Sequence, residues 1–198
     1  MTLKLHRPQA EIFVPDGIPM PEALARTTDL CIGSHQDDAE AMALSGILDC
    51  FGRTDRWFAN VVVTDGAGSA RSGLYADCSD ARMKEIRRCE QRKAAILGEY
   101  SCQILLDYPS AMVKDPAVSG TVADLKQILL VARPKTVYLH NPADKHDTHV
   151  ATFLRALTAL RHLPPAARPE RVLGCEAWRD LDWLNDEGLL YDSADAEA

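Results

Sequence analysis

Short apolar runs alternate with segments of helical periodicity along most of this chain, and this alternation limits the folds available to it. Apolar, β-branched-rich runs predict strands at 29–34, 57–64, 102–106, 136–140 and 171–175. Helical spacing of apolar residues predicts helices between them, at about 38–50, 81–97, 122–129 and 150–157. Gly98, Pro134 and Pro164 follow three of these helices as stop signals. Strands that alternate with helices form parallel βαβ units, so we expect a three-layer Rossmann-like α/β fold with a mainly parallel sheet.

The length of 198 residues is typical of one domain, which we expect to span residues 1–198. We expect residues 1–28 to form an N-terminal extension and the acidic residues 192–198 to form a frayed tail. No apolar run approaches the roughly 20 residues that cross a bilayer. The proline-rich N-terminus has no apolar core of the kind that an export signal carries. These features predict a cytoplasmic protein without a membrane span.

The charge and the cysteines exclude some classes of partner and cofactor site. The chain has 22 basic and 29 acidic residues, and a formal net charge of −7 argues against a surface that binds nucleic acid or anionic membrane. Its six cysteines are widely spread and form no C-x-x-C pair. We therefore expect reduced thiols, and neither disulfides nor a structural zinc site.

The first polar cluster, Ser34 to Glu40, lies where the first strand passes into the first helix. It contains His35 and the adjacent carboxylates Asp37 and Asp38. An imidazole and a carboxylate at a strand end suit a divalent metal, which leaves the second carboxylate free to act as a base. The alternative is structural, because Asp37 and Glu40 have the spacing of a helix capping box. This segment alone fits both interpretations.

The second cluster, His140 to His149, follows the fourth strand. His146 and His149 are three residues apart at the start of a helix and therefore share one face of its first turn. The alternative is an exposed polar loop in which Asp147 caps the helix. Four of the six histidines of the chain lie in the two clusters, and this concentration favours a metal site.

Together the clusters provide the parts of a catalytic metal centre. His35, Asp38 and His149 would supply three ligands and leave a fourth position open, as catalytic zinc sites do. Asp37 could accept a proton from a metal-bound water, and His146 could stabilise the oxyanion or protonate the leaving amine. This combination indicates metal-assisted hydrolysis of an amide.

These residues resemble the motifs of the PIG-L/LmbE family of zinc-dependent N-deacetylases. Residues 35–40 are similar to the family signature H-P-D-D-x-E, and residues 146–149 to its second signature, H-P-D-H. Residues 64–69 resemble its T-x-G-x-x-G/S loop, and the segment from Arg87 to Gly98 resembles its R-x-x-E…L-G helix. The resemblance extends from about residue 29 to residue 178 and implies an LmbE-like fold.

The resemblance also implies roles for individual residues. His35, Asp38 and His149 correspond to the zinc ligands, one ion per chain, Asp37 to the general base and His146 to the residue that stabilises the tetrahedral intermediate. Arg87 and Asp107 correspond to residues that contact the substrate. Two departures stand out: Gln36 replaces a proline, and Asp147-Thr148 replaces Pro-Asp, which removes or displaces the carboxylate expected to orient His146.

The expected function is N-deacetylation of an N-acetylated amino sugar or related glycoconjugate, a small-molecule substrate. One alternative is a zinc amidohydrolase that acts on a non-sugar acylated small molecule. Another is a non-catalytic Rossmann-like binding module whose polar clusters are only caps. The resemblance makes a homo-oligomer, a trimer or hexamer, a further expectation. Trp178 would either stack on a sugar ring or pack against the domain.

Overall fold

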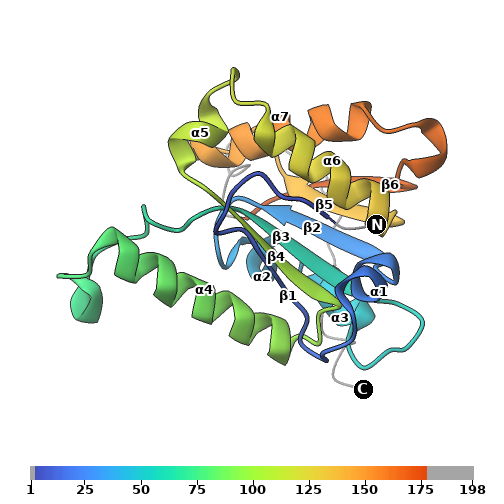
Figure 1. Cartoon of the computed structure of the whole chain (residues 1–198), viewed down its shortest axis with the longest axis horizontal. Coiled ribbons are helices and arrows are strands. Elements are labelled where there is room, and N and C mark those ends of the chain that lie inside the picture. The colour runs from blue at the N-terminus through green and yellow to red at the C-terminus, as the bar shows by residue number, and fades with distance from the viewer. Residues whose placement is uncertain (1–2, 178–198) are drawn as a thin grey trace, which may run out of the picture.

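The computed structural model of the chain describes residues 3–177 and contains one six-stranded sheet. The strands follow the spatial order β1-β4-β3-β2-β5-β6 (Figure 1). Five of them are parallel, and only β1 runs antiparallel, beside β4. Their bounds are β1 Glu11–Phe13, β2 Asp29–Gly33, β3 Phe58–Thr64, β4 Cys102–Tyr108, β5 Thr136–His140 and β6 Arg171–Cys175. The predicted mainly parallel α/β sheet is confirmed.

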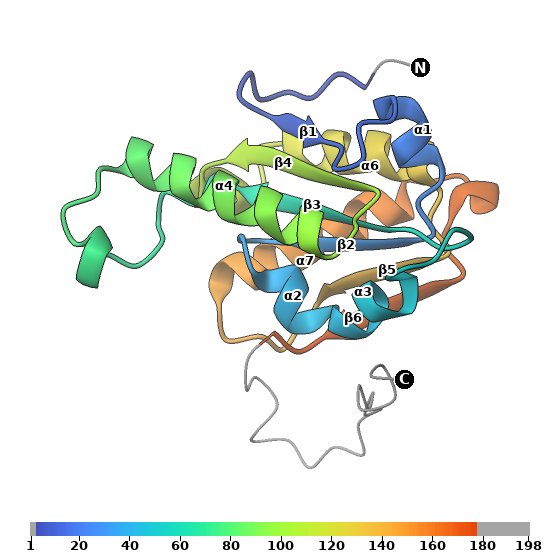
Figure 2. The same ribbon diagram turned by 90° about the horizontal axis from the view of Figure 1, so that it is seen from below.

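Helices cover both faces of this sheet (Figure 2). One face carries α1 (Met20–Ala25), α5 (Ser110–Lys114), α6 (Gly120–Ala132) and α7 (Asp147–Arg161), whereas the other carries α2 (Asp38–Met42), α3 (Leu44–Cys50) and α4 (Asp80–Leu97). Successive strand residues point to opposite faces, so Leu30 and Ile32 enter the first core and Cys31 enters the second. Two 3₁₀ turns, Gly73–Tyr75 and Pro165–Ala167, complete the elements.

The predicted helix 38–50 is two helices, because the backbone at Ala43 leaves the helical region with φ −120° and ψ 23°. Ala39, Met42, Ala43 and Ile47 all enter the same core on either side of the break. The apolar spacing therefore continues across the break, and periodicity cannot reveal it.

The expected extension 1–28 contributes strand β1 to the sheet and helix α1 to one of the helical layers. Strand β1 pairs with β4, with Glu11 opposite Leu105, and α1 buries Ala23 and Leu24 completely. These elements are three and six residues long. Segments this short contain too few residues for a hydrophobic period to be recognised in the sequence.

Gly98 ends α4 as expected, but for a different reason than a left-handed cap. Its φ is −87°, and the left-handed residue is Glu99, with φ 51°. A Cβ at Gly98 would lie 2.5 Å from Cε1 of Tyr100, so close approach of this ring requires glycine there.

The strand order places the two polar clusters side by side. The chain crosses from one half of the sheet to the other between the adjacent strands β2 and β5. Ligands of such sheets bind beyond the carboxyl ends of the strands at this crossing point. Segment 34–40 follows β2, and segment 140–149 begins at the last residue of β5. No helix in the described part of the chain is long and apolar enough to span a membrane. Trp178 and the tail 192–198 lie outside the described residues.

Candidate active site

Three donor atoms from the two clusters converge at the carboxyl end of the sheet. Nδ1 of His35 lies 3.1 Å from Nε2 of His149. The carboxylate of Asp38 completes the triangle, with Oδ2 3.6 Å from His35 Nδ1 and Oδ1 3.5 Å from His149 Nε2. Ligands of a tetrahedral zinc ion, bound at about 2.0 Å, lie about 3.3 Å apart. The three side chains thus fit the coordination sphere of such an ion.

Asp144 orients one of these side chains. Its buried carboxylate lies 2.7 Å from Nδ1 of His149 and also accepts a hydrogen bond of 2.7 Å from the backbone N–H of His146. Because the carboxylate accepts a hydrogen bond from the Nδ1–H of His149, Nε2 of this ring presents its lone pair to His35 and Asp38. Carboxylate–histidine pairs of this kind support metal-binding imidazoles in many proteins. No role for Asp144 was predicted from the sequence.

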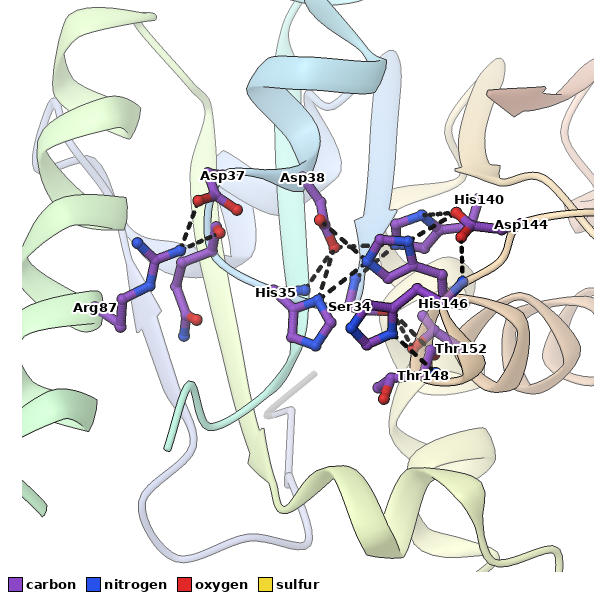
Figure 3. A network of polar contacts seen from close by, with 12 residues as sticks. Ser34, His35, Asp37, Asp38, Arg87, His140, Asp144, His146, Thr148 and Thr152 are labelled. Atoms are coloured by element: carbon purple, nitrogen blue, oxygen red, sulfur yellow. Dashed lines mark hydrogen bonds and ion pairs between the residues drawn. The ribbon is translucent and has the colours of Figure 1, made fainter. Parts of the chain in front are cut away.

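His140 is a second residue of the site for which the sequence predicted no role. It is the last residue of β5 and is fully buried. Its Nε2 lies 3.1 Å from Oδ2 of Asp38 and 3.0 Å from the backbone nitrogen of Ser34 (Figure 3). Its ring stacks on that of His149. The sequence feature that could have indicated a role for His140 is its position at the carboxyl end of a predicted strand.

The described residues include two groups that could hold a metal ion, and His149 belongs to both. One group is His35, His146 and His149, and the other is Asp38, His140 and His149. The predicted set of His35, Asp38 and His149 takes members from each group. All the donors are imidazole nitrogens or carboxylate oxygens, which suit zinc.

Burial favours the neutral forms of His35 and His149, whereas the neighbouring histidines favour the ionised form of Asp38. Burial lowers the pKa of His35 to about 4, and the neighbouring His149 and His146 also lower it. Burial and then His140 lower the pKa of His149. Burial alone would raise the pKa of Asp38, but the hydrogen bond with His140 and the electrostatic interactions with His140, His149 and His35 together outweigh it, and the pKa is lowered. Neutral imidazoles and an ionised carboxylate are the forms that bind metal.

Asp37 is the N-cap residue that precedes α2, and its backbone is strained, with φ 86° in the left-handed region. Its carboxylate is 66% exposed, lines the cavity described below and lies 2.8 Å from Nη2 of Arg87 (Figure 3). The capping-box alternative is wrong, because the Asp37 side chain makes no capping hydrogen bond. Glu40 instead accepts hydrogen bonds from Gln91 and Tyr100.

His146 caps α7 with its own ring. Its Nδ1 accepts a hydrogen bond of 3.2 Å from the backbone N–H of Thr148, so the neutral ring carries its proton on Nε2. Asp147 points outward, with 70% of its side chain exposed, and pairs with Lys114. A backbone N–H therefore orients His146, in place of the carboxylate expected from the family motif.

The predicted substrate residues Arg87 and Asp107 lie in different surroundings. Arg87 lines the cavity, and its guanidinium contacts Asp37, Glu90 and the backbone carbonyl of Gln36. Asp107 has a left-handed backbone, with φ 61°, and its buried carboxylate lies 2.7 Å from Arg88. Asp107 is not among the residues that line the cavity.

A cavity of about 480 Å³ opens beside the convergent donor atoms. His35, Asp37, Asp38, His146 and His149 line one part of it. Its other walls include the apolar side chains of Ala70, Tyr75, Met83 and Ile86. Cavities of this size are typical of small-molecule sites.

The sequence model of one family, described as PIG-L: GlcNAc-PI de-N-acetylase, matches residues 30–160. The chain belongs to the PIG-L family. The matched range includes both polar clusters, and this membership supports a hydrolase that acts on an amide bond. No curated protein sequence is similar enough to count as a match.

Solved structures with the fold of this PIG-L chain include three of stated function. N,N'-diacetylchitobiose deacetylase from Pyrococcus horikoshii is 22% identical, with a TM-score of 0.54 over 68% of this chain and 48% of that one. The A40926 pseudoaglycone deacetylase Dbv21 is 17% identical, with a TM-score of 0.57 over 85% and 71%. The 4-carboxy-2-hydroxymuconate hydratase GalB from Pseudomonas putida KT2440 is 20% identical, with a TM-score of 0.56 over 75% and 62%.

These likenesses confirm the fold of the PIG-L chain and no more. The matched region spans between 48% and 71% of the length of the three structures. Two of the three are deacetylases and one is a hydratase, so the fold by itself is compatible with more than one reaction. The choice between reactions has to come from the residues of the site.

Proposed function

We propose that this protein is a zinc-dependent N-deacetylase that hydrolyses the amide of an N-acetylated amino sugar or related glycoconjugate. The observation that carries the proposal is the convergence of His35 Nδ1, Asp38 and His149 Nε2, with separations of 3.1–3.6 Å, at one end of a cavity. Membership of the PIG-L family supports the same chemistry.

His35, Asp38 and His149 would hold the ion, one per chain, and His140 would support Asp38 through its contact of 3.1 Å. Bound zinc lowers the pKa of a coordinated water and polarises a carbonyl group. Two neutral imidazoles and one carboxylate leave a coordination position open, as catalytic zinc sites require.

Asp37 is the residue that we propose as general base. Its carboxylate lines the cavity, next in the chain to Asp38, and is exposed enough to meet a water molecule. In this role it accepts a proton from the attacking water. Arg87 holds the carboxylate at 2.8 Å and thereby restricts its orientation.

His146 is the residue that we propose as oxyanion stabiliser. The backbone N–H of Thr148 donates a hydrogen bond to Nδ1 of its ring, which leaves the Nε2 proton available for donation. Its side chain lines the cavity, and its ring lies 4.5 Å from that of His149 between centroids. A positioned N–H donor beside the scissile carbonyl stabilises the negative charge that develops there.

Arg87 remains a predicted substrate contact, because it lines the cavity. Asp107 also remains a prediction, although its contact with Arg88 would have to change before its carboxylate met a substrate. A trimeric or hexameric assembly, a cytoplasmic location and the absence of nucleic-acid partners are likewise predictions.

A second candidate substrate class follows from the apolar part of the cavity. Tyr75, Met83 and Ile86 would suit a non-sugar acylated small molecule, or an apolar substituent on a sugar, better than the hydroxyls of a bare sugar. The same zinc centre and the same bond cleavage serve both substrate classes.

Metal content and acetate release test the proposal. Protein purified without a metal-affinity tag should contain about one zinc per chain by elemental analysis. His149→Ala should lose the ion, whereas His162→Ala, at the far end of α7, should keep it. The wild type should release acetate from a panel of N-acetylated amino sugars. A chain that binds no zinc after its addition would favour the binding-module alternative, and a zinc-loaded chain that releases no acetate or other acyl group would refute the N-deacetylase.

A further inference from the structure

The peptide group that joins Gln36 to Asp37 is held from both sides by α4. Its carbonyl oxygen accepts a hydrogen bond from Nη2 of Arg87, and its N–H donates to Oε1 of Gln91 at 3.1 Å. Arg87 and Gln91 are four residues apart and therefore lie on the same face of the helix. Two side chains, one helical turn apart, thus fix the plane of a single peptide group.

The Gln91 side chain is itself fixed by its other neighbours. It is 1% exposed, and its Nε2 donates to Oε1 of Glu40 at 2.9 Å. The same oxygen accepts a hydrogen bond of 2.7 Å from the hydroxyl of Tyr100. A carboxylate can only accept, so Glu40 must face the NH₂ end of the Gln91 amide. This contact turns Oε1 of Gln91 toward the N–H of Asp37.

Asp37 needs such support because of its backbone. A φ of 86° is rare for a residue with a Cβ and persists only where the surroundings impose it. The conformation decides where the carboxylate of Asp37 points, since it sets the direction of the Cα–Cβ bond. In the observed turn the side chain lines the cavity beside His35 and Asp38.

We infer that Gln91 is a positioning residue that holds Asp37 in the conformation required for catalysis. This inference rests on the proposed function, in which Asp37 is the general base. Gln91 does not line the cavity and acts through the Asp37 N–H. Removal of its acceptor leaves that N–H unpaired and releases the turn, so the carboxylate loses its alignment with the reacting water.

Gln91→Met tests the inference, because methionine has a similar length and no strong hydrogen-bond acceptor. With the protein loaded with zinc, kcat for acetate release should fall by about 10- to 100-fold, the cost of misplacing a catalytic group. KM and zinc content should change by less than about twofold, because the cavity and the proposed ligands are untouched.

Gln103→Met is the matched control. Gln103 is also a fully buried glutamine, and its amide accepts a hydrogen bond of 3.1 Å from Asn60 in the sheet, away from the site. This variant should lose stability to a similar extent and keep its kcat. An equal fall of kcat in both variants, or an unchanged kcat in Gln91→Met, would overturn the inference.

The double variant with Asp37→Asn tests whether Gln91 acts through Asp37. Gln91→Met should not lower the residual kcat of Asp37→Asn further, because the group that it positions is already disabled. A further fall by the factor seen in the wild type would assign Gln91 a role independent of Asp37 and overturn the inference.

Amide hydrogen exchange gives a readout that needs no substrate. The Asp37 amide should exchange slowly in the wild type and at least about tenfold faster in Gln91→Met, but not in Gln103→Met. If the wild type releases no acyl group, the proposed function fails, and exchange alone decides whether Gln91 anchors the turn. Equal exchange of the Asp37 amide in the wild type and in Gln91→Met would refute the anchor.

Discussion

The carboxylate of Asp144 lies 2.7 Å from Nδ1 of His149, on the side of the ring away from the nitrogen that faces His35 and Asp38. Both residues belong to segment 140–149. The same carboxylate also accepts a hydrogen bond from the backbone N–H of His146. One buried acid therefore orders the loop and selects the tautomer in which His149 presents a lone pair to the proposed metal.

Asp144→Ala should weaken zinc binding by about 10- to 100-fold, because the carboxylate no longer orients the His149 ring or raises its basicity. Competition with a chelator of known affinity measures the change. Asp147→Ala is the control, because Asp147 belongs to the same segment but is exposed and pairs with Lys114. Its zinc affinity should stay within about twofold of the wild type, and an equal loss in both variants would contradict the role of Asp144.

Removal of zinc should destabilise the protein. A ligand that binds only the folded state, at a free concentration about 1,000 times its Kd, adds about 4 kcal/mol to the free energy of unfolding. For a chain of this size that is a rise in Tm of roughly 8–16 °C. Calorimetry with excess chelator and after zinc is added back measures it. His35→Ala should abolish the zinc-dependent rise and His162→Ala should retain it; a Tm insensitive to zinc in the wild type would argue against the metal site.

His146→Ala should lower kcat by about 10²- to 10³-fold while zinc remains bound, since the lost group is a donor to the developing oxyanion. Its ring does not belong to the proposed ligand set, and Thr148 occupies its Nδ1. Steady-state kinetics together with metal analysis distinguish a loss of kcat from a loss of bound zinc. Loss of zinc in this variant would instead place His146 among the ligands, with His35 and His149.

Gly46→Ala should destabilise the fold by about 1–2 kcal/mol, although alanine favours a helix over glycine. The new Cβ would lie 2.6 Å from the hydroxyl end of Tyr138, whose ring is buried beneath α3. Chemical denaturation measures the loss. Gly174→Ala, where the nearest atom is 3.9 Å away, should change stability by less than about 0.5 kcal/mol. A stabilised Gly46→Ala variant would mean that the Tyr138 ring moves aside freely.

The five parallel strands were predictable because each is a short apolar run between turn signals; β2, β3, β4 and β5 are also fully buried, whereas β6 is partly exposed. The adjacency of His35, Asp38 and His149 followed from the rule that parallel strands bring their carboxyl ends to one edge. Strand β1 and helix α1 were not predictable, since three and six residues carry no readable period.

The sequence alone does not show which arginine of α4 faces the site. Arg87 and Arg88 are neighbours in the chain, yet about 100° separates their side chains around the helix axis. Arg87 therefore contacts Asp37, whereas Arg88 contacts Asp107. Which neighbour faces the site depends on the rotation of the helix over the sheet, and packing of the whole helix sets this rotation.

By itself, the sequence determined the α/β class, the parallel sheet and the segments that carry the polar residues, because these follow from local periodicity and motif spacing. Only the tertiary structure decided the partners of individual polar atoms: Asp144 for His149, His140 for Asp38 and Gln91 for the Asp37 N–H. These contacts require distances of about 3 Å between elements far apart in the chain. Such distances depend on how helices pack on the sheet, which no local pattern encodes.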